Sequence, residues 1–108
     1  MTIGEKIKEL KEDLSIDCYF ITRPENKTNC IVYTYTEVPD IIGDMKEIGT
    51  RYTILFNLYC TNKVEETKEL VKKALADHGF KKKNIIGTVK ENDVFNTALQ
   101  YTISLKNN

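Results

Sequence analysis

The sequence predicts a two-layer α+β fold, in which two helices pack against a mainly antiparallel or mixed sheet. Residues 3–14 and 64–78 have apolar side chains at helical spacing, whereas five other segments are rich in β-branched and aromatic residues or alternate between apolar and polar ones. These segments follow each other in the order α-β-β-β-α-β-β. Because no linker or repeat interrupts the 108 residues, we expect one domain, residues 1–108.

The first predicted helix has a narrow apolar stripe on an otherwise charged surface. Thr2 and Glu5 have the spacing of a capping box, in which each residue hydrogen-bonds to the backbone of the other. This pattern predicts a surface helix whose stripe faces the sheet. The stripe consists of Ile3, Ile7, Leu10 and Leu14.

Two strands are expected next, in residues 16–22 (IDCYFIT) and 30–36 (CIVYTYT). The intervening RPENKTN contains Pro and Asn, so we predict a turn that joins the two strands. Residues 37–49 (EVPDIIGDMKEIG) combine Pro and Gly with acidic and apolar residues. This composition is too irregular for a strand and too apolar for an inert linker, and it favours a functional or interface loop.

The segment Thr50–Cys60 has apolar side chains on both faces, which is typical of a central strand. A helix is predicted to follow, with Thr61 or Asn62 as its N-cap and Gly79 as its stop.

The chain closes with a predicted hairpin. A weaker strand interrupted by Gly87 leads through a tight turn at residues 91–93 into a strongly alternating last strand. The apolar residues that are in phase on the helices and the best strands should form one core. They are Ile7, Leu10, Ile54, Phe56, Leu58, Leu70, Val71, Leu75, Leu99, Tyr101 and Ile103.

Composition argues against several classes of partner. The 16 basic and 16 acidic residues cancel, which removes the general attraction to nucleic acid or anionic membranes. Only Arg23 and Arg51 offer the planar guanidinium that suits phosphate recognition. Apolar runs are short and the N-terminus is charged, so we expect a soluble cytosolic protein without a membrane span or secretory leader.

Few residues are candidates for catalysis or for metal binding. Cys18, Cys30 and Cys60 lie far apart among β-forming residues, which favours reduced, buried thiols over a disulfide or a metal site. His78 stands at a predicted helix end, where packing and the helix dipole explain it. We therefore expect no metal, no cofactor and no catalytic residue, and an enzyme that combines His78 with a cysteine is the least favoured alternative.

Two charged segments are candidates for a subunit interface. The run Lys81, Lys82 and Lys83 opens a predicted edge strand, where lysines usually act as a solvated guard against aggregation. The segment 37–47 is its acidic counterpart. A basic edge and an acidic loop would permit head-to-tail self-association, although two separate solvated faces would give the same composition. The loop candidates are Ile41, Ile42, Asp44 and Met45.

In the order of its elements and in several segments, the chain resembles the small tail-completion or tail-terminator proteins of long-tailed bacteriophages and prophages. The resemblance covers nearly the whole chain. It lies in the N-terminal helix followed by IDCYFITRPENKTNCIVYTYTE, in the strand GTRYTILFNLYC, in the helix ETKELVKKALADHGF and in the closing ENDVFNTALQYTIS. None of these segments is a catalytic motif.

The resemblance implies a structural virion component with an α+β sandwich fold. Proteins like this form a ring, usually a hexamer, that caps the finished tail tube and joins it to the head connector. The implied partners are further copies of the chain, the tail-tube protein and the head-connector protein. The implied location is the host bacterial cytoplasm during assembly and then the virion tail. Such proteins often have His or Lys near the start of the last strand, whereas this chain has Asn96 and Thr97, and no family-specific functional residue can be carried over.

One alternative from another class stays open beside this reading. A small, non-enzymatic module could bind a protein or a small ligand in the crevice between the sheet and the helices.

Overall fold

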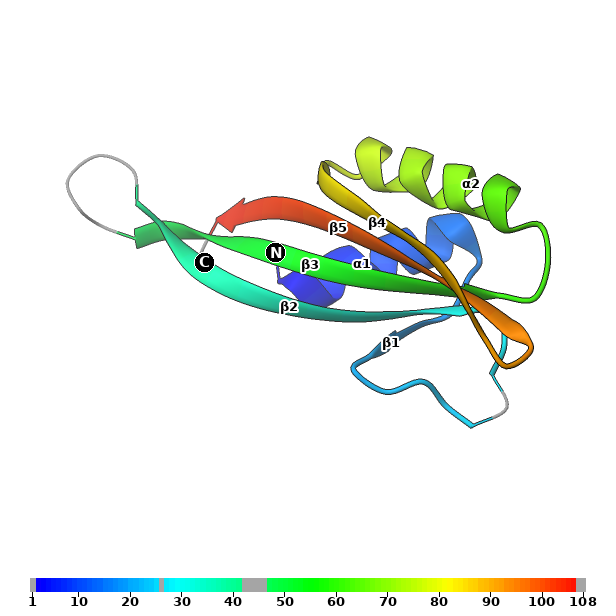
Figure 1. Ribbon diagram of the computed structural model, residues 1–108. Helices are drawn as coiled ribbons and strands as arrows, with labels where there is room; N and C mark the ends of the chain where they lie inside the picture. The colour runs from blue at the N-terminus through cyan, green and yellow to red at the C-terminus, as the bar shows by residue number, and fades with distance from the viewer. Residues whose placement is uncertain (1, 26, 42–46, 107–108) are drawn as a thin grey trace.

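A computed structural model describes residues 2–25, 27–41 and 47–106 of the chain. Two helices and a five-stranded mixed sheet follow the predicted order, which confirms the α+β fold (Figure 1). The elements are α1 (Ile3–Leu14), β1 (Cys18–Phe20), β2 (Cys30–Ile41), β3 (Glu47–Cys60), α2 (Val64–Asp77), β4 (Lys81–Glu91) and β5 (Val94–Lys106).

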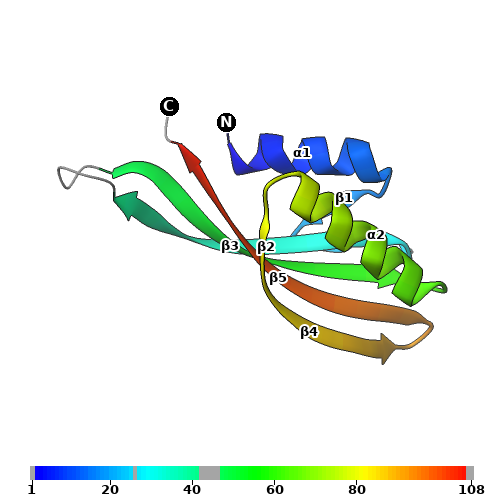
Figure 2. The same ribbon diagram turned by 90° about the horizontal axis from the view of Figure 1, so that it is seen from above.

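The strands lie in the order β1-β2-β3-β5-β4, and β3 is the central strand, as predicted. Only the β1–β2 pair is parallel, and the other three pairs are antiparallel. Both helices lie on the same side of the sheet (Figure 2). The helices therefore cover one face of the sheet, and on the other face Cys30 and Val32 are still buried, with Arg23 of the β1–β2 connection lying over the ring of Tyr59.

The core lies between the helices and the covered face. Phe56 is fully buried, and its ring contacts those of Phe80 and Tyr101 edge-on, with centroid separations of 5.8 and 6.3 Å. All predicted core residues are buried except Leu70, which is 54% exposed, so this prediction was wrong. The buried stripe of α2 is Val71, Ala74 and Leu75, and Leu70 lies at its margin.

The two helices begin differently. The capping box of α1 is present as predicted: the Glu5 backbone N–H donates to Thr2 Oγ1 at 3.2 Å, and the Thr2 backbone N–H donates to Glu5 Oε1 at 3.1 Å. The predicted cap of α2 at Thr61 or Asn62 was wrong. The N-cap is Lys63, with φ 52°, and its side chain makes no capping hydrogen bond.

The predicted turn between the first two strands was also wrong, because β1 and β2 are parallel. Ile21 adopts φ 69°, and the Thr22 backbone N–H donates back to the Phe20 carbonyl at 2.8 Å. This tight turn ends β1 after three residues. The connection then brings the chain back to the Asp17 carbonyl, which accepts from the Ile31 backbone N–H at 2.8 Å.

The predicted loop at 37–49 is shorter than expected. Strand β2 continues to Ile41, and β3 begins at Glu47. Pro39 is tolerated within β2 and is paired with Thr50, because a proline at a sheet edge can direct its missing N–H away from the neighbouring strand. Among the predicted interface residues, Ile42, Asp44 and Met45 lie outside the described residues.

The C-terminal hairpin of β4 and β5 is confirmed, with Asn92 at φ 55° in its turn. Strand β4 shifts register twice, between Lys82 and Asn84 and between Ile85 and Gly87. Lys83 and Ile86 are therefore additional residues in an irregular edge strand.

Candidate functional site

The predicted lysine run lies at one edge of the sheet. Among the described strands, β4 pairs only with β5, and Lys81, Lys82 and Lys83 are exposed at its start. Further along, the side chains of Ile86 and Val89 are 58% and 57% exposed. We call these five residues the β4 edge. Its lysines and irregular register are typical devices against uncontrolled strand pairing.

The opposite edge of the sheet is formed by β1 and by the second half of β2. Strand β1 pairs only with Ile31–Tyr33, and no described strand lies on that side of β2 beyond Tyr33. The Ile21 backbone N–H donates to the Tyr33 carbonyl, so Tyr33 directs its backbone groups outward. By strand alternation, Tyr35, Glu37 and Pro39 direct theirs the same way.

Ile21 holds a strained conformation at this edge. A positive φ is rare for a β-branched residue, and such strain persists where the surrounding structure enforces it. The side chains of Phe20 and Ile21 are 51% and 60% exposed. We call Phe20, Ile21, Tyr35 and Glu37 the β1–β2 edge. Sequence reasoning placed Phe20 and Ile21 inside a regular strand and missed this feature.

A row of aromatic rings supports the β1–β2 edge. The ring of Phe20 lies 5.4 Å from that of Tyr33 and 5.5 Å from that of Tyr35, and the Tyr35 ring lies 5.4 Å from that of Tyr52. Burial, and then the nearby negative charge of Glu37, raise the pKa of Tyr52. Glu37 therefore lies beside this row, opposite Tyr52 in the register of β2 and β3.

The structure thus separates the two groups of predicted interface residues. The lysines lie on the β4 edge, whereas Ile41, the one loop candidate that is described, ends β2 on the other side of β3 and β5. Of the acidic residues predicted in that loop, Glu37 and Asp40 lie in β2 itself. The pattern of Pro39 within a β-rich segment was the available signal for an edge strand.

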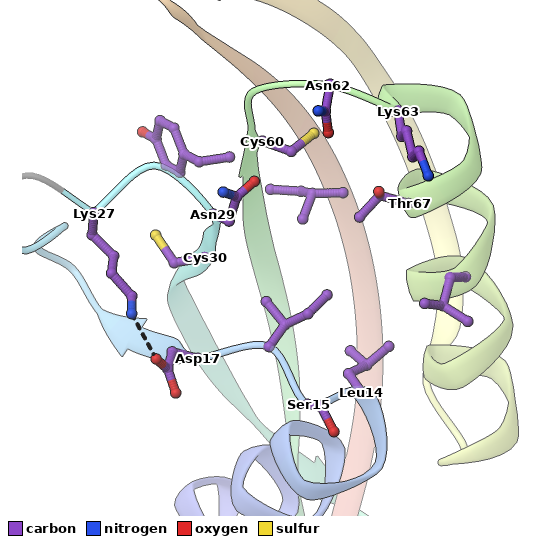
Figure 3. Close-up of a pocket in the computed structure, with 14 residues that line it drawn as sticks. Leu14, Ser15, Asp17, Lys27, Asn29, Cys30, Cys60, Asn62, Lys63 and Thr67 are labelled. Atoms are coloured by element: carbon purple, nitrogen blue, oxygen red, sulfur yellow. Dashed lines mark ion pairs between the residues drawn. The ribbon is translucent and has the colours of Figure 1, made fainter.

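A pocket of about 410 Å³ opens at one end of the sheet, between the C-terminus of α1 and the N-terminus of α2 (Figure 3). Leu14, Cys30 and Cys60 contribute to its lining. Asp17 and Lys27 form an ion pair at 2.9 Å on one side of it, opposite Lys63 and Thr67 (Figure 3). The Lys27 ammonium lowers the pKa of Asp17, and Asp17 in turn raises the pKa of Lys27.

The three cysteines are free thiols. Burial raises the pKa of Cys18 to about 11 and also raises the pKa values of Cys30 and Cys60. A raised pKa leaves little thiolate at neutral pH, so these thiols are poor nucleophiles and poor metal ligands. Within the described residues, no cluster of three or more His, Cys, Asp or Glu side chains is placed to hold a metal ion.

His78 has a structural partner. Its Nε2 lies 3.0 Å from Asp13 Oδ2, so the residue links the end of α2 to the end of α1. Sequence reasoning could not predict this pair, because 65 positions separate the two residues.

The chain matches no protein-family model and no curated protein sequence. Neither helix in the described part of the chain is long and apolar enough to cross a membrane.

Proposed function

We propose that the chain is the subunit of a ring that ends the tail tube of a long-tailed phage or prophage and joins it to the head connector. The observation that carries the proposal is the pair of unlike, accessible edges on opposite sides of one sheet. The β4 edge is basic and the β1–β2 edge is aromatic and acidic.

Unlike edges favour a ring over a two-fold dimer. When one surface binds a different surface of the next copy, the contact repeats around an axis and closes if the rotation allows it. The neutral net charge of the chain is compatible with this arrangement, because opposite charges lie on different edges.

The shape of the subunit supports a second contact. The molecule measures 52 × 23 × 21 Å, and the paired ends of β2 and β3 extend beyond both helices (Figure 1). In a ring, this projecting arm would be available to the tail tube or to the head connector. The resemblance in element order to tail-terminator proteins is consistent with this role.

The proposal can be tested on tail tubes assembled in vitro. The tail-tube protein encoded by the same phage genome is polymerised with and without this chain, and tube lengths are measured by electron microscopy. We expect tubes of limited length with the chain and continued growth without it. A Lys82→Glu variant should cap fewer tubes, whereas Lys8→Glu, on the exposed face of α1, serves as a matched control. Tubes that grow identically with and without the chain would refute the proposal.

The pocket beside Asp17 and Lys27 favours a second candidate, a non-enzymatic binding module. Its volume of about 410 Å³ lies within the range of small-molecule sites. If this candidate is correct, small polar molecules should raise the melting temperature of the wild-type chain, and Asp17→Asn should abolish the rise. A chain that caps tubes and whose melting temperature no such molecule raises would exclude it.

A further inference from the structure

We infer that copies of this chain join side by side, with the β1–β2 edge of one copy against the β4 edge of the next. This inference rests on the proposed ring and names the surfaces that would close it. Three features of the two edges carry it: their level in the sheet, their apolar side chains and their charges.

Exposed apolar side chains lie on both edges at the same position along the strands, as judged by the rows of paired residues that cross the sheet. Phe20 is paired with Tyr33, and Ile21 follows it directly. On the other side of the sheet, Ile86 directly follows Ile85. The strand register connects these two sites through a single row, which consists of Tyr33, Phe56, Leu99 and Ile85.

Charged side chains of opposite sign lie further along the same two edges, with Glu37 one row beyond the row of Lys81 and two rows beyond that of Lys82. One row joins Thr36, just before Glu37, to Lys81 on the β4 edge. The next joins Tyr35 to Lys82. The first row consists of Thr36, Thr53, Thr102 and Lys81, and the second of Tyr35, Ile54, Tyr101 and Lys82. A copy displaced sideways along the rows therefore brings apolar groups against apolar groups and lysines towards Glu37.

The charges also decide which edges meet. Two β4 edges paired about a two-fold axis near Lys82 would bring Lys81, Lys82 and Lys83 against the same three lysines, and two β1–β2 edges paired about an axis near Glu37 would bring Glu37 against Glu37. Both arrangements are repulsive, whereas the unlike pair is attractive. The partner that these edges fit is therefore a second copy of this chain, bound head to tail.

The same edges limit the strength of the contact. Pro39 has no backbone N–H to donate, and β4 is interrupted by Lys83 and Ile86 as additional residues. Long, regular strand pairing between copies is therefore disfavoured. The contact depends on a few side chains, so it should be weak in isolation and sensitive to salt.

Chemical crosslinking tests the arrangement with the chain alone. One preparation carries Glu37→Cys and another carries Lys82→Cys, and a short bismaleimide is added to each and to their mixture. Cys30 and Cys60 are buried and Cys18 is half-buried, so wild-type chain treated in the same way gives the blank. We expect dimer in the mixture at several times the yield of either single preparation. Equal yields in all three samples, or no crosslink in any, would overturn the inference.

A second pair of variants separates contact from folding. Ile21→Asn removes the apolar side chain but suits a positive φ, since Asn adopts this conformation more readily. We expect it to lower the crosslinking yield several-fold with no fall in melting temperature. Leu70→Asn is the matched control, because Leu70 is exposed to a similar extent but lies on α2, and its crosslinking yield should not change. An unchanged yield with Ile21→Asn would exclude the apolar part of the contact.

Failure of this inference differs from failure of the proposed function. If the chain caps tubes but gives no selective crosslink, the proposed ring stands and the contact between these two edges is excluded. If the chain crosslinks selectively but has no effect on tubes, the contact between the edges stands and the tail-terminating role is excluded.

Discussion

Phe56 is the residue on which most of the core packing converges. It is fully buried on the central strand, between Phe80 of the segment after α2 and Tyr101 of β5. Truncation of a buried aromatic side chain loses its transfer free energy and leaves a cavity.

We therefore expect Phe56→Ala to lower the free energy of unfolding by about 3–5 kcal/mol, measured by denaturant titration. Phe20→Ala is the control, because half of the Phe20 side chain is already exposed and its loss should cost the monomer much less. Equal losses for the two variants would contradict the assigned strand register.

Because of Cys18, the free energy of unfolding should decrease at alkaline pH. Burial raises its pKa from 9.0 to about 11 in the folded chain. In the window between these values the unfolded chain loses the thiol proton while the folded chain retains it, so unfolding becomes more favourable as pH rises. We expect the melting temperature to fall from pH 9 to pH 11, and to fall less steeply in Cys18→Ala. The same slope in both proteins would show that Cys18 is not buried as described.

At the level of the secondary-structure elements, two glycines lie near helix ends and differ in backbone conformation. Gly79 follows α2 with φ +88°, and an added Cβ there would meet no atom within 4 Å. Any cost of substitution is therefore conformational rather than steric. Gly4 lies inside α1, where an added Cβ would have only ordinary contact, 3.9 Å from Thr2 Oγ1.

Alanine at these two glycines should have opposite effects on thermal unfolding. We expect Gly79→Ala to destabilise the chain by about 1–2 kcal/mol, because alanine disfavours a positive φ. Gly4→Ala should stabilise it by at most about 0.5–1 kcal/mol, since glycine is unfavourable within a helix and Gly4 lies in the first turn of α1. Effects of the same sign would contradict the described helix boundaries.

Periodicity predicted the elements better than their pairing. The apolar stripe of α1 and the alternation of β5 depend on neighbouring residues, so both were readable from sequence. The parallel pairing of β1 and β2 depends on the turn at Ile21, where no glycine or asparagine marks the positive φ. Leu70 fits the helical period but lies at the margin of the stripe, which only the position of the sheet decides.

At the scale of the whole molecule, the sequence predicted one half of the candidate contact. The run Lys81–Lys83 was expected on an edge strand, and the structure places it there. The acidic half was expected in a loop, but Glu37 lies in β2, because Pro39 at a sheet edge does not end the strand. The rows of paired residues connect the two edges because the strands lie in the order β2-β3-β5-β4. No local sequence pattern specifies this strand order.

The most direct test of the head-to-tail ring is cryo-electron microscopy of tube ends assembled with this chain. The predicted result is a closed ring at the tube end, in which the β1–β2 edge of each copy lies against the β4 edge of the next. Glu37 should then lie near Lys81 and Lys82 of its neighbour. Tube ends without the chain, or copies joined through identical edges, would contradict the account.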